Sequence, residues 1–127
     1  MFDFQKRRNA QIVAQGSPNY PIYVGVINAG IIQWFDKDQQ IADGQKYDYF
    51  DTMLITNNGP NSIELYLDTQ NNNIPVLAYN AKSLKGQPFR RWGIKNTGSA
   101  NTTAGDIILE ISRSSGIVQT PASGVVK

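Results

Sequence analysis

The 127-residue sequence contains no cysteine and no histidine. Without cysteine, the chain has no disulfide, no thiolate metal ligand and no thiol nucleophile. Without histidine, it lacks the side chain that most often acts as a general base near neutral pH and most often binds zinc. The two absences exclude the usual Ser-His-Asp hydrolases and His-based metal enzymes, and they favour a protein that is not an enzyme.

Long apolar runs and strong charge are also missing. No apolar segment approaches the roughly 20 residues of a membrane-spanning helix, and the opening residues 1–8 lack the apolar centre of a signal peptide. Twelve basic and ten acidic side chains give a net charge of only +2, far from the basic stripe of a general nucleic-acid binder. We therefore expect no membrane contact, no nucleic-acid binding by the folded body, and no cofactor or metal.

The sequence does contain a series of short stretches in which apolar and polar residues alternate, as in β-strands. Turn residues, chiefly Asn, Gly and Pro, separate these stretches at intervals of about ten residues, which is typical of sandwiches and barrels. We predict an all-β, single-domain antiparallel β-sandwich, jelly-roll-like, with extended N- and C-terminal arms. The sandwich is expected at residues 10–115, the N-terminal arm at residues 1–9 and the C-terminal tail at residues 116–127.

Two hairpins are expected from strands that lie close together in the sequence. Residues 89–95 and 107–111 form the first, around a polar loop at residues 96–105. Residues 20–27 and 31–35 form the second. A short first strand is also expected at residues 11–14.

Three further strands are expected between these hairpins. Residues 47–56 place Met53 and Ile55 on one face and Phe50 on the other, residues 63–68 alternate most regularly, and residues 74–79 contain Pro75. Because proline cannot donate to a ladder, Pro75 predicts an edge or irregular strand. The predicted central core consists of Leu65, Leu67, Trp92, Ile94, Leu109 and Ile111.

Two units of this pattern resemble known proteins: Met53-Leu-Ile-Thr-Asn-Asn-Gly-Pro-Asn-Ser-Ile-Glu-Leu-Tyr-Leu67, and Phe89-Arg-Arg-Trp-Gly-Ile-Lys-Asn-Thr-Gly98 with Ala104-Gly-Asp-Ile-Ile-Leu-Glu-Ile111. Over residues 45–112 the chain resembles small β-sandwich virion proteins of bacteriophages, including capsid decoration and vertex proteins. The resemblance implies a structural role in the virion, contacts with the major capsid protein and with further copies of the chain, and no catalytic residues. A symmetric homo-oligomer is the expected form.

The residues expected to contact partners lie in the N-terminal arm, on one strand and in the polar loop. Two aromatic anchors and a cationic cluster in the arm would meet an acidic or phosphate surface, or else the arm is simply solvated. A large ring opposite the inward face of its strand would be exposed for a partner or ligand. In order along the chain, these residues are Phe2, Phe4, Lys6, Arg7, Arg8, Tyr66, Asn96 and Asn101.

Two other classes of function stay open at this point. The aromatic residues could form a sugar-stacking platform, as in a carbohydrate-binding module or a receptor-binding fibre head. Carboxylate pairs could hydrolyse glycosides if they flanked a sugar, and the candidate pairs are Asp36 with Asp38, Asp48 with Asp51, and Glu64 with Glu110. A calcium loop starting at Asp36 fails, because its sixth position holds Ile41 and its twelfth holds Tyr47.

Overall fold

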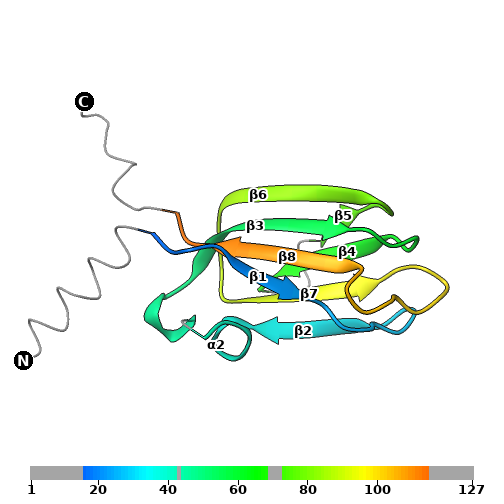
Figure 1. The fold of residues 1–127 in the computed structure, drawn as a ribbon, viewed down its shortest axis with the longest axis horizontal. Coiled ribbons are helices and arrows are strands. Elements are labelled where there is room, and N and C mark those ends of the chain that lie inside the picture. Colours follow the sequence, from blue (N-terminus) through cyan, green and yellow to red (C-terminus); the bar gives the residue numbers. More distant parts are fainter. Residues whose placement is uncertain (1–15, 43, 69–72, 115–127) are drawn as a thin grey trace, which may run out of the picture.

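The computed structural model describes residues 16–42, 44–68 and 73–114, which form two packed four-stranded antiparallel sheets (Figure 1). The first sheet has the order β1 (Tyr20–Tyr23), β8 (Ile107–Ser112), β3 (Phe50–Asn57), β6 (Asn80–Phe89). The second has the order β2 (Ile32–Asp36), β7 (Arg91–Asn96), β4 (Ile63–Leu67), β5 (Asn73–Val76). Eight antiparallel strands distributed over two sheets in this order form a jelly roll. The predicted all-β sandwich fold is therefore confirmed. The arms and the strand expected at residues 11–14 lie outside the described residues.

The hydrophobic core fills the space between the sheets, where the inward faces of both carry apolar side chains. Five of the six predicted core residues are fully buried, and Leu67 packs against them partly buried. The Trp92 ring stacks on Phe35 with centroids 6.0 Å apart and meets the edge of Phe89 at 5.9 Å. Burial of each such side chain contributes about 1.5–3 kcal/mol, so this layer supplies the main stabilisation.

Neither of the two predicted hairpins is formed, so this prediction is wrong. Strand β7 pairs with β2 and β4, whereas β8 pairs with β1 and β3, so residues 97–106 cross from one sheet to the other. In the same way, β1 and β2 belong to different sheets. Alternation indicates which side chains of a strand face the core, but it does not indicate to which of the two sheets the strand belongs. Among the described strands, β4 and β5 are the only consecutive pair that share a sheet.

Strand β3 begins later than expected and contains a bulge. Its register against β6 shifts between Phe50 and Thr52. Because a bulge inserts an extra residue, Phe50 is buried with Met53 and Ile55 and not on the opposite face as predicted. The residues before it form a short 3-10 helix, η1 (Gly44–Lys46), which follows helix α2 (Lys37–Gln40).

The other predicted strands differ from the observed ones mainly where the residues are exposed. Strand β5 lies at the edge of its sheet, which confirms the interpretation of Pro75. No strand was expected at residues 80–88, but they belong to β6, which is the longest of the described strands and forms the edge of the other sheet. Its side chains are nearly all exposed, so it carries no apolar alternation. The alternation expected through residue 27 ends at Tyr23, since Val24 and Ile27 are both buried while Val26 is exposed.

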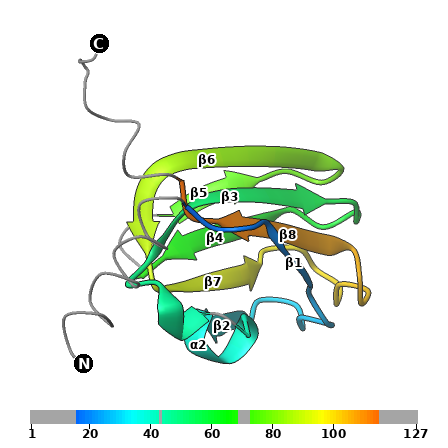
Figure 2. The ribbon, with the colours of Figure 1, turned by 60° about the vertical axis from the view of Figure 1, so that its left-hand side comes forward.

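The sandwich has two different ends (Figures 1 and 2). Residues 16 and 114, from which the arms continue, leave at one end, here called the arm end. The connections β1–β2, β3–β4, β5–β6 and β7–β8 lie at the opposite end, here called the loop end. None of the helices in the described ranges is long and apolar enough to cross a membrane.

Candidate interaction surfaces

The roots of the two arms are hydrogen-bonded to each other at the arm end. The amide N–H of Ser17 donates to the carbonyl of Arg113 at 2.9 Å, and the amide N–H of Arg113 donates to Ser17 Oγ at 2.7 Å. The chain therefore enters and leaves the sandwich at neighbouring points.

A buried carboxylate fixes the C-terminal root. Asp51 lies at the bulge of β3 and accepts hydrogen bonds from Ser114 N at 2.8 Å and from Ser114 Oγ at 2.5 Å. Beside it, the guanidinium of Arg113 lies over the Tyr49 ring at 3.8 Å and donates to the Tyr49 carbonyl at 3.4 Å. Asp51 and Arg113 are both buried. These contacts fix where both arms leave the body, and we call them the root clamp.

The five predicted contact residues of the N-terminal arm lie outside the described residues. Their role stays a prediction. The root clamp is a feature that the sequence analysis missed, because its members are separated by up to 96 positions in the chain.

Two asparagines each close a turn at the loop end with the same pair of side-chain hydrogen bonds. Asn57 Oδ1 accepts from Gly59 N at 3.1 Å while its Nδ2 donates to the Asn61 carbonyl at 2.7 Å. Asn96 Oδ1 accepts from Gly98 N at 2.9 Å while its Nδ2 donates to the Ala100 carbonyl at 2.7 Å. The repeated Asn-x-Gly turns in the sequence thus share one chemistry, an Asx turn closed by the side chain. A positive φ, another common feature of Asn and Gly turns, occurs at Gly30 (+76°) and not at Gly59 or Gly98.

Further hydrogen bonds join neighbouring loops to one another. Thr102 Oγ1 accepts from Ile27 N at 2.8 Å, and Asn101 Oδ1 accepts from Ala29 N at 3.0 Å. A Cβ added to Gly98 would lie 2.5 Å from Asn61 Oδ1, so the β3–β4 and β7–β8 loops are in close contact. Tyr79 N donates to the Gly59 carbonyl at 3.2 Å, so the β5–β6 connection is joined as well. The four connections of the loop end therefore form a fixed platform instead of independent flexible loops.

The structure places the two predicted loop residues differently. Asn96 is fully buried, and both polar atoms of its side chain are hydrogen-bonded within the protein. Asn101 is exposed, with its side-chain oxygen bonded to the β1–β2 loop. Partner binding by either residue stays a prediction.

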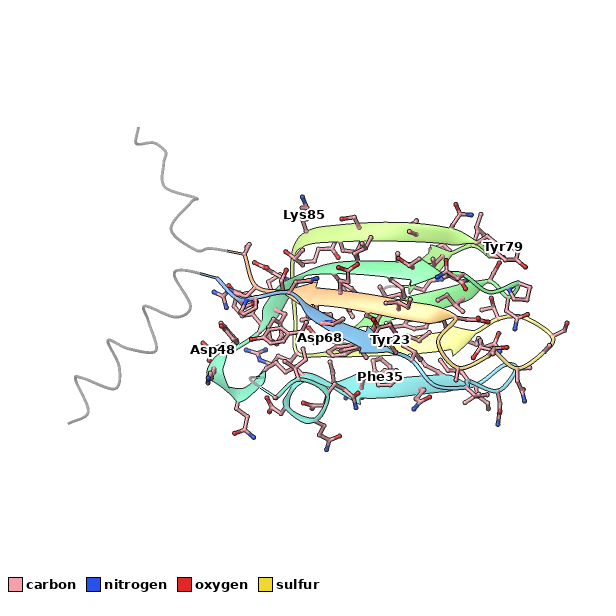
Figure 3. The ribbon with its side chains drawn as sticks, viewed as in Figure 1. Tyr23, Phe35, Asp48, Asp68, Tyr79 and Lys85 are labelled. Carbon is pink, nitrogen blue, oxygen red and sulfur yellow. The ribbon has the colours of Figure 1, made fainter. Side chains whose placement is uncertain are left out.

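Large apolar side chains are exposed on two connections of the loop end. They are Val26 and Ile31 on β1–β2, and Leu77 and Tyr79 on β5–β6. Tyr79 is 71% exposed and has φ at +57°, a left-handed conformation that costs of order 1–3 kcal/mol for a non-glycine residue. Figure 3 shows it projecting at this end of the sandwich. Exposed apolar residues on a fixed platform are typical of a contact surface.

The outer face of the second sheet carries an aromatic cluster. Trp34 lies against Gly93, where an added Cβ would be 3.0 Å from the indole ring. The guanidinium of Arg91 lies over the same ring at 4.5 Å, and the Tyr66 ring is 6.4 Å away. Tyr66 is only 8% exposed, so the expectation of an exposed ring is wrong. A glycine inside a strand is the sequence signal for such a close approach.

Hydrogen bonds shift two pKa values in this cluster. Tyr66 Oη donates to Glu64 Oε1 at 2.7 Å, and Asn73 Nδ2 donates to Glu64 Oε2 at 3.1 Å. The bond from Tyr66, then that from Asn73, lowers the pKa of Glu64 because both stabilise the carboxylate. The same bond to Glu64 raises the pKa of Tyr66 because it stabilises the protonated phenol.

The candidate carboxylate pairs have other partners. Asp36 Oδ1 accepts from Asp38 N at the start of α2, and Asp38 pairs with Lys37 Nζ at 2.7 Å. Glu64 and Glu110 belong to different sheets, and Asp51 is part of the root clamp. Within the described ranges, His, Cys, Asp and Glu side chains form no group of three or more that could hold a metal ion.

Comparisons with known proteins give a distant structural likeness and no related sequence. No family model matches the chain, and no curated protein matches it. The chain is similar to the coat protein of Tobacco streak virus, with 7% sequence identity, a TM-score of 0.42, and coverage of 86% of this chain and 94% of that one. A likeness this distant carries no argument about function.

Proposed function

We propose that the protein is a non-enzymatic structural component of a virus particle, of the bacteriophage decoration or vertex type. It binds the major capsid protein and further copies of itself, and it stabilises the capsid through the sandwich and its terminal arms. The observation that carries this proposal is the root clamp. It holds the starts of both arms side by side, at the end opposite the exposed apolar loops.

The clamp places the starting points of the two arms side by side. Phe2 and Phe4 supply apolar anchors, and the cluster at residues 6–8 supplies positive charge. Because both arms start from neighbouring points, they can reach one surface of a neighbour together, and binding by one arm raises the effective concentration of the other. A jelly roll also occurs in lectins and cupins, so the fold by itself does not decide the function.

Truncation tests the proposal. Deletion of residues 1–8 and 117–127 is expected to leave a folded β domain with a nearly unchanged thermal midpoint, because the root clamp and the sheets remain. The same deletion is expected to abolish incorporation into the virus particle. Circular dichroism melting reports the fold, and co-sedimentation with the particle reports binding. A truncated protein that still co-sediments would refute the role of the arms.

A point variant separates the clamp from the arms themselves. Asp51→Ala removes both hydrogen bonds to Ser114 and leaves each arm at full length. Hydrogen bonds to a charged group contribute about 1.5–3 kcal/mol to stability, so their loss leaves the C-terminal root less ordered. Because that ordering must then be restored on binding, we expect particle affinity to fall about tenfold. Asp48→Ala is the matched control, since it removes an exposed carboxylate close by in the sequence. Equal affinities for the two variants would contradict the positioning role of the clamp.

The aromatic cluster supports a second candidate, a carbohydrate-binding module or receptor-binding head. Trp34 is partly exposed on the outer face, with the guanidinium of Arg91 and the carboxylate of Glu64 close by to hydrogen-bond hydroxyl groups. A titration of tryptophan fluorescence with a panel of oligosaccharides tests this candidate. Saturable binding that Trp34→Ala abolishes would favour it, and a flat response to the whole panel would exclude it for those sugars.

A further inference from the structure

The sandwich has an apolar pocket on its open side, where the edge strands β5 and β6 lie next to each other. It is half open, has a volume of about 300 Å³, and is lined by Pro75, Leu77, Asn80, Ala81 and Lys82. This volume is at the lower end of the range for ligand pockets, about 300–1,000 Å³, and suits one or two aromatic side chains. Leu77 is 61% exposed at its rim. The pocket therefore offers uncovered apolar surface beside two strand edges.

Lys82 lines this pocket as an exposed cation that has no partner among the described residues. Lys82 pairs in register with Ile55, which is fully buried, so Lys82 is on the inward side of its edge strand. It forms no hydrogen bond or ion pair with any residue in the described part of the chain, and the salt bridge seen there joins Lys37 to Asp38. An inward lysine also protects an edge strand from aggregation. Next to an apolar pocket, however, the ammonium group complements an apolar segment that carries a carboxylate.

The N-terminal arm contains a segment with that chemistry. Outside the described residues the chain has two acidic side chains, Asp3 and Asp43. Asp3 stands between Phe2 and Phe4, whereas Asp43 stands between Ala42 and Gly44. Only the first combines a negative charge with large apolar groups on both sides.

The length of the arm indicates which copy supplies the segment. The arm leaves at the arm end, whereas Leu77 is on the β5–β6 connection at the loop end. The 13 peptide steps from Ser17 back to Phe4 span at most about 45 Å, and the ten-residue strand β6 is about 33 Å long. To fill its own pocket, the arm would have to turn back along nearly the whole sandwich. A neighbouring copy can present its pocket next to the point where the arm starts.

We propose that the segment Phe2-Asp3-Phe4 of one copy occupies the β5–β6 pocket of a second copy, with Asp3 paired to Lys82. This inference rests on the proposed structural role and identifies one of its contacts. The contact is head-to-tail, because an arm meets a pocket and not a second arm. Repetition of such a contact builds a ring or an extended array, as a protein present in many copies requires.

Cysteine cross-linking tests the contact, since the chain has no cysteine of its own. One full-length sample carries Phe4→Cys and a mass label, and the other carries Ala81→Cys. Mild oxidation of the mixture is expected to give a mixed disulfide dimer in excess of either homodimer. The control replaces Ala81→Cys with Asp48→Cys, an exposed position at the arm end (Figure 3), and is expected to give little mixed dimer. Equal yields with both partners would overturn the proposal.

Charge exchange supplies a second, independent readout. Asp3→Lys and Lys82→Glu are each expected to weaken self-association about tenfold in sedimentation equilibrium, and the double variant is expected to restore it. Absence of restoration would overturn the Asp3–Lys82 pair. A single chain that carries both Phe4→Cys and Ala81→Cys tests which copy supplies the arm. If it forms only an internal disulfide, the pocket is occupied by the arm of the same chain, and the proposed contact between copies is wrong. Co-sedimentation with the particle is measured separately, so these failures remain distinct from a failure of the proposed function.

Discussion

Asn96 offers the sharpest test of whether the loop end is a fixed platform. Its buried side chain accepts one hydrogen bond, from Gly98 N at 2.9 Å, and donates two, to the carbonyls of Ile27 at 3.0 Å and Ala100 at 2.7 Å. Asn96→Ala removes all three, in a site that the neighbouring loops close. Gly98 N then loses its acceptor, whereas the carbonyls of Ile27 and Ala100 keep the hydrogen bonds from Thr102 N at 3.0 Å and Asn61 Nδ2 at 2.8 Å. The structure therefore predicts a loss of stability and not only a loss of contact with a partner.

The size of the effect follows from the three bonds. Each contributes about 0.5–1.5 kcal/mol net, so the variant is expected to lose about 3 kcal/mol. That is a large fraction of the roughly 5–15 kcal/mol of a small domain. For a chain of this length it corresponds to a fall of about 10 °C in Tm.

Thermal and urea unfolding, followed by circular dichroism, measure this loss. Asn58→Ala is the matched control, because Asn58 is exposed and no hydrogen bond of its side chain is seen among the described residues. It is expected to change Tm by no more than a degree or two. If Asn96→Ala kept the parental midpoint but lost particle binding, Asn96 would be a contact residue and the account of the loop end would be wrong.

Three further predictions concern the core, a loop contact and a pKa. Leu109→Ala is expected to destabilise the fold by about 2–5 kcal/mol in urea unfolding, and an unchanged midpoint would place this strand face at the surface. Gly98→Ala should lower Tm because its Cβ would overlap the β3–β4 loop, whereas Gly25→Ala, with open space around it, should not; equal midpoints would contradict the loop contact. Tyr66→Phe should raise the pKa of Glu64 toward its ordinary value in an NMR titration. The lowered pKa of Glu64 stabilises the fold above the unfolded-state pKa, and this contribution is lost as pH falls through the folded-state pKa, so the variant should show less loss of stability in acid; an unshifted titration would refute the role of the tyrosine bond.

The sequence by itself determined which side chains face inward on most strands. Leu65, Trp92 and Leu109 were identified as core residues because alternation with a period of two is a local property of an extended chain. Pro75 marked an edge strand for an equally local reason, the missing N–H. The Asn-x-Gly turns were also visible, although the side-chain hydrogen bonds that close them were not.

Only the tertiary structure decided which strands are neighbours. Strands β7 and β8 have inward faces that suit either sheet, and their assignment to opposite sheets depends on pairing with segments far away in the sequence. Strand β6 was missed because an exposed edge strand has no buried face, so nothing in its sequence requires alternation.

The candidate interaction surfaces also depend almost entirely on the tertiary structure. Tyr66 is covered because Gly93 lets Trp34 lie close to the sheet, and Asp51 reaches Ser114 because a bulge turns it out of the ladder. Each of these contacts joins residues that are distant along the chain. Local periodicity carries no information about such pairs, because their proximity depends on how the whole chain closes around its core.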